Sequence, residues 1–327
     1  MTTVRIGTRG SQLALFQANA VAALLRERAG EASEIVVIRT SGDRLADASL
    51  AQIGGKRLFV KEIEDALLEG AIDLAVHSSK DMPALLPDGL VVGAVLPRED
   101  ARDAVILPHT GSGAQASGLS HDEVIGRLGH APRIGTSSIR RSAQLRRLVP
   151  GARFEPIRGN LDTRLRKLDA GACEAIVLAA AGLKRLGFES RISAVLPPEA
   201  CVPAPGQGII AVEVRAAGRA MRQLAARIDD PAAAAALTAE RAVVTALGGG
   251  CQMPIGAYAS IAGTSLTLTA IVVSIDGRRE VRAAAAGDLM EAAAVGARAA
   301  ERLLAGGAAD ILADVERTRA AVEGLQP

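Results

Sequence analysis

Short apolar runs alternate with amphipathic segments along the first two thirds of the chain. Runs of this length are typical of strands, which we expect at residues 4–8, 35–40, 72–76, 90–96, 103–107, 133–135, 154–157, 174–180 and 208–214. Between them, segments with one apolar face predict helices at residues 11–28, 56–68, 138–148 and 160–170. Strands that alternate with helices in this way predict mostly parallel sheets covered by helices, which is an α/β fold.

The C-terminal part of the chain follows a different pattern. A predicted helix begins at Pro231 and ends at Gly248. Strands are expected at residues 257–261, 265–274 and 279–284. Asp276 and Gly277 separate the last two strands and predict a hairpin turn. Two alanine-rich helices close the chain, so this part is expected to be an α+β domain with a small antiparallel sheet.

The composition argues against several classes of protein. Hydrophobic residues fill 49% of the 327 positions, which is enough for two or three buried cores. No apolar run approaches the roughly 20 residues of a membrane helix, and the first residues hold no apolar signal segment, so we expect neither a membrane protein nor a secreted one. The three cysteines form no CxxC pair and favour a reducing cytoplasm. The four histidines are scattered without an HExxH motif, so no metal site is predicted.

Positive charge is concentrated in one segment, although the net charge is only +2. Between Arg133 and Lys167 the sequence has ten lysines and arginines against two acids, Glu155 and Asp162. A local surplus of this size attracts an anionic partner. A nucleic acid is a poor candidate, because Phe154 is the only aromatic residue of the segment and single-stranded bases stack on aromatic side chains.

Four stretches combine the end of a predicted strand with small polar residues and charge. The side chains there that could carry chemistry are Arg9, Ser11, Lys80, Asp81, Ser138, Arg140, Arg141, Arg158 and Arg164. Each has a simpler explanation when taken alone, since the serines can cap helices, the adjacent arginines can form a solvated face and the acid can support a turn. Cations in the first turn of a helix also oppose its dipole unless an anion binds there. Their repetition at strand ends, where open α/β sheets bind ligands, favours a ligand with several carboxylates or phosphates.

The stretch GGGCQMPIG, residues 248–256, places Cys251 in a glycine-rich loop. Glycines let the backbone adopt positive φ and let a large group approach closely. A buried packing cysteine needs neither property, so we expect this loop to present the sulfur to a ligand. Cys173 and Cys201 lack such surroundings and are expected to be small packing residues.

Taken together, eight stretches resemble the porphobilinogen deaminase family of tetrapyrrole biosynthesis. They are GTRGSQLALFQ, GGKRLFVKEIE, VHSSKDMP, GTSSIRRSAQLRR, RGNLDTRLRKLD, AAAGLKRLG, PAPGQG and GGGCQMPIGA, which occur in the family's order across residues 7–257. The resemblance implies two lobes like those of a periplasmic binding protein, with the active site between them, and a third domain that carries the cofactor. It places the lobe with the catalytic acid at residues 1–97 and 208–226, the arginine-rich lobe at 102–203 and the cofactor-anchoring domain at 230–327.

The resemblance also implies a reaction and a role for each candidate residue. The enzyme would be a cytoplasmic monomer that joins four porphobilinogen molecules head to tail into hydroxymethylbilane, with release of ammonia. The chain would grow on a dipyrromethane cofactor held by a thioether at Cys251, with Asp81 as the catalytic carboxylate. Cofactor binding is implied for Lys80, Ser138, Arg140, Arg141, Arg158, Arg164 and Gln207. Substrate binding is implied for Arg9, Ser11, Arg185 and Lys56.

The sequence departs from the family pattern in two places. Gln52 stands where a lysine is expected in some relatives, so Lys56 would carry more of the charge of its loop. Residues 108–131 form a longer segment than expected and are interpreted as a surface excursion. The alternative function is a solute-binding protein of similar two-lobed fold for a polycarboxylate ligand. That alternative explains the anion-binding strand ends, but it explains neither the third domain nor Cys251.

Overall fold

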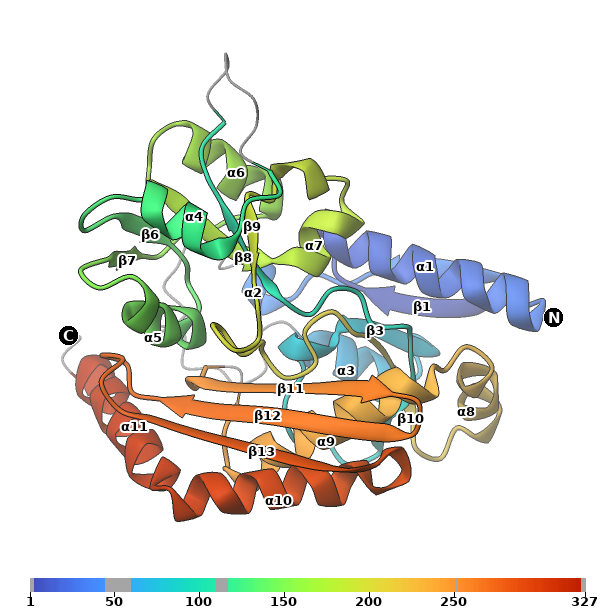
Figure 1. Cartoon of the computed structure of the whole chain (residues 1–327). Coiled ribbons are helices and arrows are strands. Elements are labelled where there is room, and N and C mark those ends of the chain that lie inside the picture. Colours follow the sequence, from blue (N-terminus) through green and yellow to red (C-terminus); the bar gives the residue numbers. More distant parts are fainter. Residues whose placement is uncertain (1–2, 45–59, 110–116, 251, 325–327) are drawn as a thin grey trace.

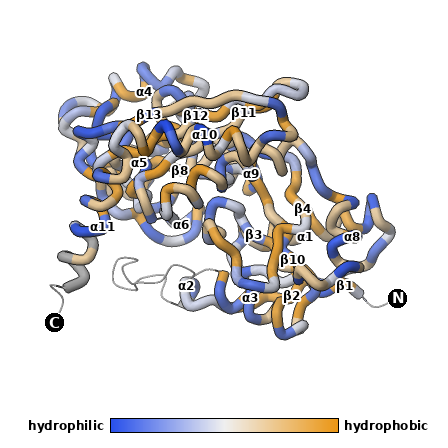
Figure 2. The backbone as a smooth tube through the Cα atoms, turned by 90° about the horizontal axis from the view of Figure 1, so that it is seen from below, coloured by the Kyte–Doolittle hydropathy of each residue, from blue (hydrophilic) through white to orange (hydrophobic). Residues whose placement is uncertain are grey.

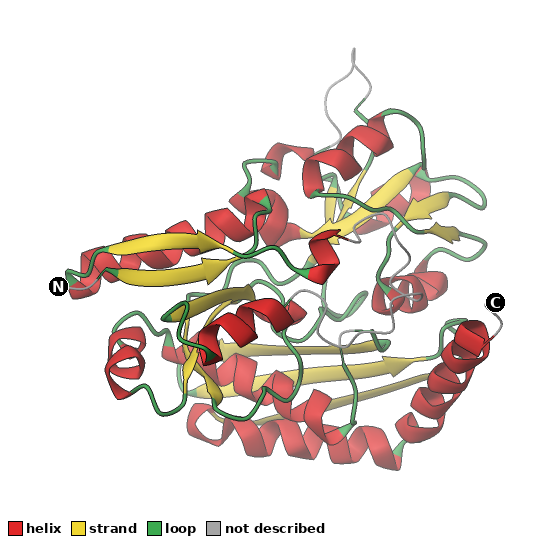
Figure 3. Ribbon diagram, turned by 180° about the vertical axis from the view of Figure 1, so that it is seen from behind, coloured by secondary structure: helices red, strands yellow, loops and turns green. Residues whose placement is uncertain are grey.

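The computed structural model describes residues 3–44, 60–109, 117–250 and 252–324, and it contains three sheets with helices packed around them (Figures 1 and 3). Two are five-stranded sheets, and the third is a three-stranded sheet near the C-terminus. Within the described residues, no helix is long and apolar enough to cross a membrane.

The first sheet, with its helices, is lobe 1. Its strand order is β2 (Ser33–Val37), β1 (Val4–Thr8), β3 (Leu74–Ser78), β10 (Ile210–Arg215) and β4 (Leu90–Val95). β10 is antiparallel to both of its neighbours, so the other four strands share one direction. The helices of this lobe are α1 (Gln12–Ala29), α2 (Ser41–Arg44), α3 (Lys61–Leu68) and α8 (Arg219–Ala226). Figure 2 shows the hydrophobic residues following central strands such as β4 and β10, which form the core of this lobe.

Lobe 2 repeats this plan. Its strand order is β7 (Arg153–Glu155), β6 (Arg133–Gly135), β8 (Ala175–Ala179), β5 (Asp103–Ile106) and β9 (Ala194–Leu196), with β5 antiparallel to both neighbours. Its helices are α4 (His121–Arg127), α5 (Ile139–Leu148), α6 (Leu161–Asp169) and α7 (Ala180–Arg185). The chain passes between the lobes twice, at residues 96–102 and 197–209, which we call the crossing segments.

The third domain is the predicted α+β unit. β11 (Ile255–Ala262), β12 (Ser265–Val273) and β13 (Glu280–Asp288) form an antiparallel meander. α9 (Pro231–Ala246), α10 (Ala292–Ala305) and α11 (Ala308–Gly324) pack with it around one hydrophobic core. The fold class expected from the sequence is therefore confirmed.

Local sequence signals account for most element boundaries. The Ser11 hydroxyl accepts a hydrogen bond from the Ala14 amide at 3.3 Å, and the Asp230 carboxylate accepts one from the Ala233 amide at 2.7 Å, so both residues cap their helices. Gly277 adopts φ 74° in the turn between β12 and β13, where an L-residue with a side chain is strained.

Several predicted boundaries were wrong, because pairing with neighbouring strands decides where a strand ends. β2 begins and ends earlier than predicted, and β3 runs two residues further, so His77 and Ser78 belong to the strand. Part of the segment interpreted as a surface excursion is the helix α4. In the predicted helix 56–68, residues 56–59 lie outside the described residues, and the observed helix begins at Lys61. Short 3-10 turns, at Ser79–Asp81, Glu189–Arg191 and Leu289–Glu291, complete the structure.

Candidate active site

Asp81 lies at the end of the buried strand β3. The strand runs into a single 3-10 turn, Ser79–Asp81, in which the Ser79 amide donates to the Ile209 carbonyl at 3.0 Å. Ser79 and Met82 are buried on either side, whereas Asp81 is exposed. A rigid strand end therefore presents this carboxyl to the outside of the lobe.

A small cavity of about 60 Å³ brings Asp81 together with two other predicted site residues, Arg9 and Ser11. Its lining also includes Gln17 and His77. Arg9 and Ser11 follow β1, which pairs in parallel with β3, so the two strands end at the same edge of the sheet. The Arg9 guanidinium is held by the Asp43 carboxylate through its Nε–H at 3.0 Å. Ser11 both caps α1 and lines the cavity.

On lobe 2, Arg140 and Arg141 occupy the first turn of α5. Ser138 caps this helix, because its hydroxyl accepts a hydrogen bond from the Arg141 amide at 3.4 Å. Both arginines are buried, with exposed fractions of 4% and 7%. The interpretation of this pair as a solvated face is therefore excluded.

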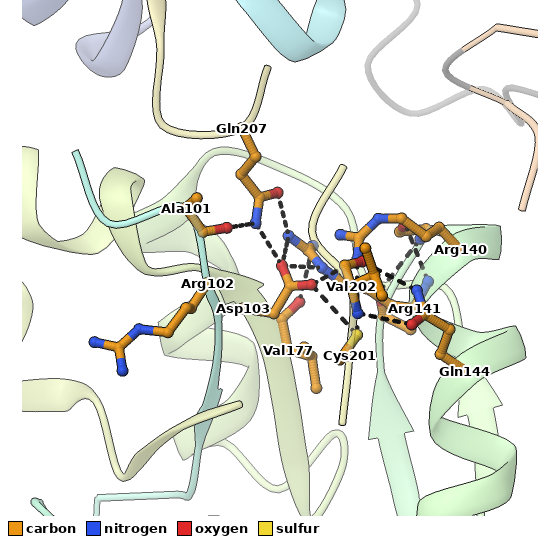
Figure 4. Close-up of polar contacts among 12 residues, drawn as sticks. Ala101, Arg102, Asp103, Arg140, Arg141, Gln144, Val177, Cys201, Val202 and Gln207 are labelled. Atoms are coloured by element: carbon orange, nitrogen blue, oxygen red, sulfur yellow. Dashed lines mark hydrogen bonds and ion pairs between the residues drawn. The ribbon is translucent and has the colours of Figure 1, made fainter. Parts of the chain in front are cut away.

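Asp103 is the anion that holds both guanidiniums (Figure 4). Its Oδ2 lies 2.7 Å from Arg140 Nη1, and its Oδ1 lies 2.7 Å from Arg141 Nη2. Burial alone would raise the pKa of this fully buried carboxyl, but the charges of Arg140 and Arg141 outweigh it and hold the pKa well below its usual range. Sequence reasoning assigned Asp103 no role. The sequence did hold one signal for it. Asp103 begins the apolar strand 103–106, and a carboxylate buried with such a strand needs a partner.

The crossing segments complete the contacts of this cluster. Gln207 Nε2 donates to the Ala101 carbonyl at 2.6 Å and to Asp103 Oδ1 at 2.9 Å. Arg140 Nη1 donates to the Val202 carbonyl at 2.7 Å. Gln207 thus joins both crossing segments to the arginine pair, as Figure 4 shows.

Lys80 of lobe 1 interacts electrostatically with this cluster. Burial lowers the pKa of its ammonium group to about 8, and the guanidiniums of Arg141 and Arg140 act in the same direction. The carboxylates of Asp81 and Asp103 oppose this shift. The turn after β3 in lobe 1 and the first turn of α5 in lobe 2 therefore lie within electrostatic reach of each other.

Arg164 and Arg158 add further positive charge. Burial lowers the pKa of Arg164, and the neighbouring charges of Arg141 and Arg158 lower it further, against the effect of Asp81. The Arg164 Nε–H donates to the Gly159 carbonyl at 2.8 Å. The structure thus brings together residues from three of the four stretches noted in the sequence. Together they form a cationic cluster that also contains the carboxylates of Asp81 and Asp103, and its cations are Lys80, Arg140, Arg141, Arg158 and Arg164.

Arg185 contacts a crossing segment. Its Nη2 donates to the Gly208 carbonyl of a crossing segment at 2.7 Å, and its main charged neighbour is Glu99. Cys251 and Lys56 lie outside the described residues. In the loop before Cys251, Gly248 adopts the positive φ expected of a glycine, at 63°. The side chain of Ile255 fills the space beside Gly249, where a Cβ would lie 2.4 Å from it.

Cys173 and Cys201 are both buried thiols. Burial raises the pKa of Cys173, and it raises that of Cys201 to about 12. Neither thiol is therefore a ready nucleophile near neutral pH. Among the described residues, no group of three His, Cys, Asp or Glu side chains could hold a metal ion.

Comparison with known proteins adds the family. The family model "Porphobilinogen deaminase, dipyromethane cofactor binding domain" matches residues 4–223, and "Porphobilinogen deaminase, C-terminal domain" matches residues 234–305. The chain is 47% identical over 315 residues to the porphobilinogen deaminase of Syntrophobacter fumaroxidans, covering 96% of this chain and 98% of that one. It is 46% identical over 321 residues to that of Geobacter metallireducens, covering 98% and 97%.

Among solved structures, the chain is similar to the BvgS VFT2 domain of Bordetella pertussis, with a TM-score of 0.40, 16% identity and coverage of 69% and 86%. It is also similar to a TRAP periplasmic solute binding protein from Ralstonia eutropha, with a TM-score of 0.37, 14% identity and coverage of 72% and 80%.

The fold and the site define a two-lobed α/β protein with a third domain and a cationic cluster between the lobes. The family matches extend over nearly the whole chain. The chain belongs to the porphobilinogen deaminase family. The predicted enzyme class, a transferase of tetrapyrrole biosynthesis, and the predicted dipyrromethane cofactor are thereby confirmed.

Proposed function

We propose that the chain is a hydroxymethylbilane synthase that joins four porphobilinogen molecules head to tail and releases the linear tetrapyrrole by hydrolysis. The observation that carries this proposal is the cationic cluster where the lobes meet. Lys80, Arg140, Arg141 and Arg164 interact there with the carboxylates of Asp81 or Asp103, and Arg158 adds positive charge beside Arg164. A growing pyrrole chain is a fitting ligand, because each ring brings an acetate and a propionate. Guanidinium groups pair with such carboxylates through two parallel hydrogen bonds.

The residues of the cluster suit the dipyrromethane cofactor. The buried Arg140 Nε–H has no hydrogen-bond partner among the described residues, and a ligand carboxylate would satisfy this donor. We assign the cofactor carboxylates to Lys80, Ser138, Arg140, Arg141, Arg158 and Arg164, with Gln207 behind them. The bound dipyrromethane supplies the free pyrrole carbon to which the first porphobilinogen is joined.

We place the covalent attachment of the cofactor at Cys251. Formation of a thioether needs a thiolate nucleophile, and burial raises the pKa of both Cys173 and Cys201. No described atom lies within 4 Å of the place where a Cβ would stand on Gly248 or Gly250, which leaves room for a pyrrole ring beside the backbone. The third domain is then the cofactor-anchoring domain, residues 230–327, beside the lobes at 1–97 with 208–226 and at 102–203.

Asp81 is the general acid in this proposal. Its carboxyl group donates a proton to the aminomethyl nitrogen of porphobilinogen, so that ammonia leaves. The resulting carboxylate then stabilises the positive charge that develops on the pyrrole ring. It regains a proton when the new carbon–carbon bond forms and the ring carbon loses its hydrogen.

Arg9 and Ser11 share the cavity of Asp81, which supports their assignment to the incoming porphobilinogen. We assign Arg185 and Lys56 to the same substrate. We expect the enzyme to act as a monomer, because nothing in the proposed reaction needs a second subunit. We also expect it to be cytoplasmic.

Intact-mass analysis with peptide mapping tests the proposed function. We expect the purified protein to carry the mass of two pyrrole units on the peptide that contains Cys251. Cys251→Ser should remove this adduct, whereas Cys173→Ser and Cys201→Ser should retain it. Ammonia release from porphobilinogen by a protein of unmodified mass would contradict the proposal, and so would a loaded protein that releases no ammonia.

A further inference from the structure

Asp103 occupies a central place in lobe 2 that the proposed reaction does not use directly. It is the first residue of β5, directly after a crossing segment, and β5 pairs with β8 and β9 on either side. Its side chain is fully buried. An ionised carboxylate in this position is stable only when donors surround it.

The two oxygens of Asp103 are divided between two guanidiniums. Arg140 takes Oδ2, while the Arg141 Nε–H donates to Oδ1 at 2.9 Å. Gln207 Nε2 also donates to Oδ1, at 2.9 Å. Each guanidinium therefore has one side occupied by Asp103, which fixes the direction of its remaining N–H groups.

The charges of this group do not cancel. Two guanidiniums share one carboxylate, so one positive charge is left for a ligand. The ammonium group of Lys80 in lobe 1 also interacts electrostatically with these three groups. Without the carboxylate, the two adjacent guanidiniums would repel each other and keep only neutral acceptors, such as the Val202 carbonyl for Arg140 and the Val177 carbonyl for Arg141. Arginine side chains held less firmly are less well ordered, so ligand binding must supply the entropy cost of ordering them.

We propose that Asp103 is a positioning residue, which aligns Arg140 and Arg141 so that their remaining N–H groups receive the carboxylates of the bound pyrrole chain. This inference rests on the proposed function. Asp103 touches no ligand in this account and acts only through the two arginines. Gln207 holds Asp103 in turn and ties it to the Ala101 carbonyl of a crossing segment.

Asp103→Asn tests the proposal, with Gln144→Leu as its matched control. Gln144 is also buried and holds the crossing segment 197–209, since it donates to the Val202 carbonyl at 3.1 Å and accepts from the Val202 amide at 2.8 Å. These hydrogen bonds reach Val202, whose carbonyl also accepts from Arg140, but they reach neither Asp103 nor a guanidinium directly. The control therefore reproduces the loss of buried hydrogen bonds beside the arginines while leaving their carboxylate in place.

We expect folded Asp103→Asn protein to carry about tenfold less covalent dipyrromethane than the parent. Losing one well-aligned hydrogen bond between a guanidinium and a ligand carboxylate lowers binding by about that factor. The loaded fraction should show a raised KM for porphobilinogen with a smaller change in kcat. Asp103→Glu should recover part of the occupancy. Gln144→Leu should lower the melting temperature and leave occupancy near that of the parent.

Equal occupancy and KM in Asp103→Asn and Gln144→Leu would overturn the proposal, because the role of Asp103 would then be structural only. If Asp103→Asn does not fold, Asp103→Glu replaces it in the test, because it keeps the buried charge and shifts the carboxylate. Parent-like occupancy and KM in Asp103→Glu would then overturn the proposal, since the position of the carboxylate would not matter. A parent protein without the two-pyrrole mass would refute the proposed function instead, so the two failures are distinguishable.

Discussion

Arg98 and Glu240 form an ion pair between a crossing segment and the third domain, with 2.6 Å between Nη1 and Oε1. Glu240 is fully buried and also accepts hydrogen bonds from the amides of Gly206, at 2.6 Å, and Ala259, at 2.7 Å. Arg98 in turn lies over the ring of Tyr258 at 5.0 Å. One carboxylate thus joins both crossing segments to α9 and β11.

Glu240→Gln should therefore destabilise the whole molecule. It leaves the largely buried Arg98 without its counter-ion, and breaking such a pair typically costs about 3–5 kcal/mol of unfolding free energy. Glu174→Gln is the control, because the pair of Glu174 with Arg133 is exposed and should be worth no more than about 1 kcal/mol. Denaturant unfolding of both variants measures the difference, and equal losses would contradict the central role of Glu240.

Asp81→Asn should remove activity without removing stability. Asn supports similar turns and caps but has no transferable proton, and loss of general acid catalysis typically costs ~10²–10⁴ in rate. Asp81→Glu should retain some activity, since the carboxyl group survives at a shifted position. Ammonia release and melting temperature decide the matter, with Asp122→Asn, an exposed acid, as the control. A rate for Asp81→Asn within about tenfold of the parent rate would contradict general acid catalysis by Asp81 and leave it only a structural role.

Replacing different arginines should impair different steps, either loading of the cofactor or elongation. Arg140→Leu and Arg141→Leu should yield mainly protein without cofactor, because the anionic pyrroles must bind before the thioether forms. Arg185, which contacts a crossing segment, is expected to matter more for the incoming substrate, so Arg185→Leu should hold cofactor and elongate poorly. Arg153→Leu, at an exposed position of lobe 2, should behave like the parent. Intact mass and ammonia release separate these outcomes, and equal cofactor occupancy in the Arg140, Arg141 and Arg185 variants would refute the division.

Lys80 should give the protein a pH dependence near pH 8. Its pKa is lowered from 10.5 to about 8 in the folded protein, so between these values the unfolded chain binds a proton that the folded protein does not. Unfolding free energy should therefore rise with pH across this window in the parent relative to Lys80→Met. Anion binding by the cluster should weaken over the same range as the ammonium loses its charge. A pH-independent stability difference between parent and Lys80→Met would contradict this prediction.

Much of this protein follows from local sequence. The caps at Ser11, Ser138 and Asp230 and the turn at Gly277 depend on side chains and backbone angles within a few residues, so the pattern of the chain predicts them. The parallel strands also bring Arg9 and Asp81 to one edge of their sheet, because β1 and β3 end side by side. The motif order was sufficient to predict the family.

The tertiary structure alone decided which charges meet. Asp103 lies 37 residues from Arg140 and 104 from Gln207, and Arg98 lies 142 residues from Glu240. These pairs depend on the two passages of the chain between the lobes, which also insert β5 and β10 antiparallel to their neighbours. Local spacing carries no information on such contacts, because a buried charge is stabilised by whichever donor the completed fold places within about 3 Å. For that reason the sequence predicted an anion for Arg140 and Arg141, and only the fold identified one of their anions as Asp103.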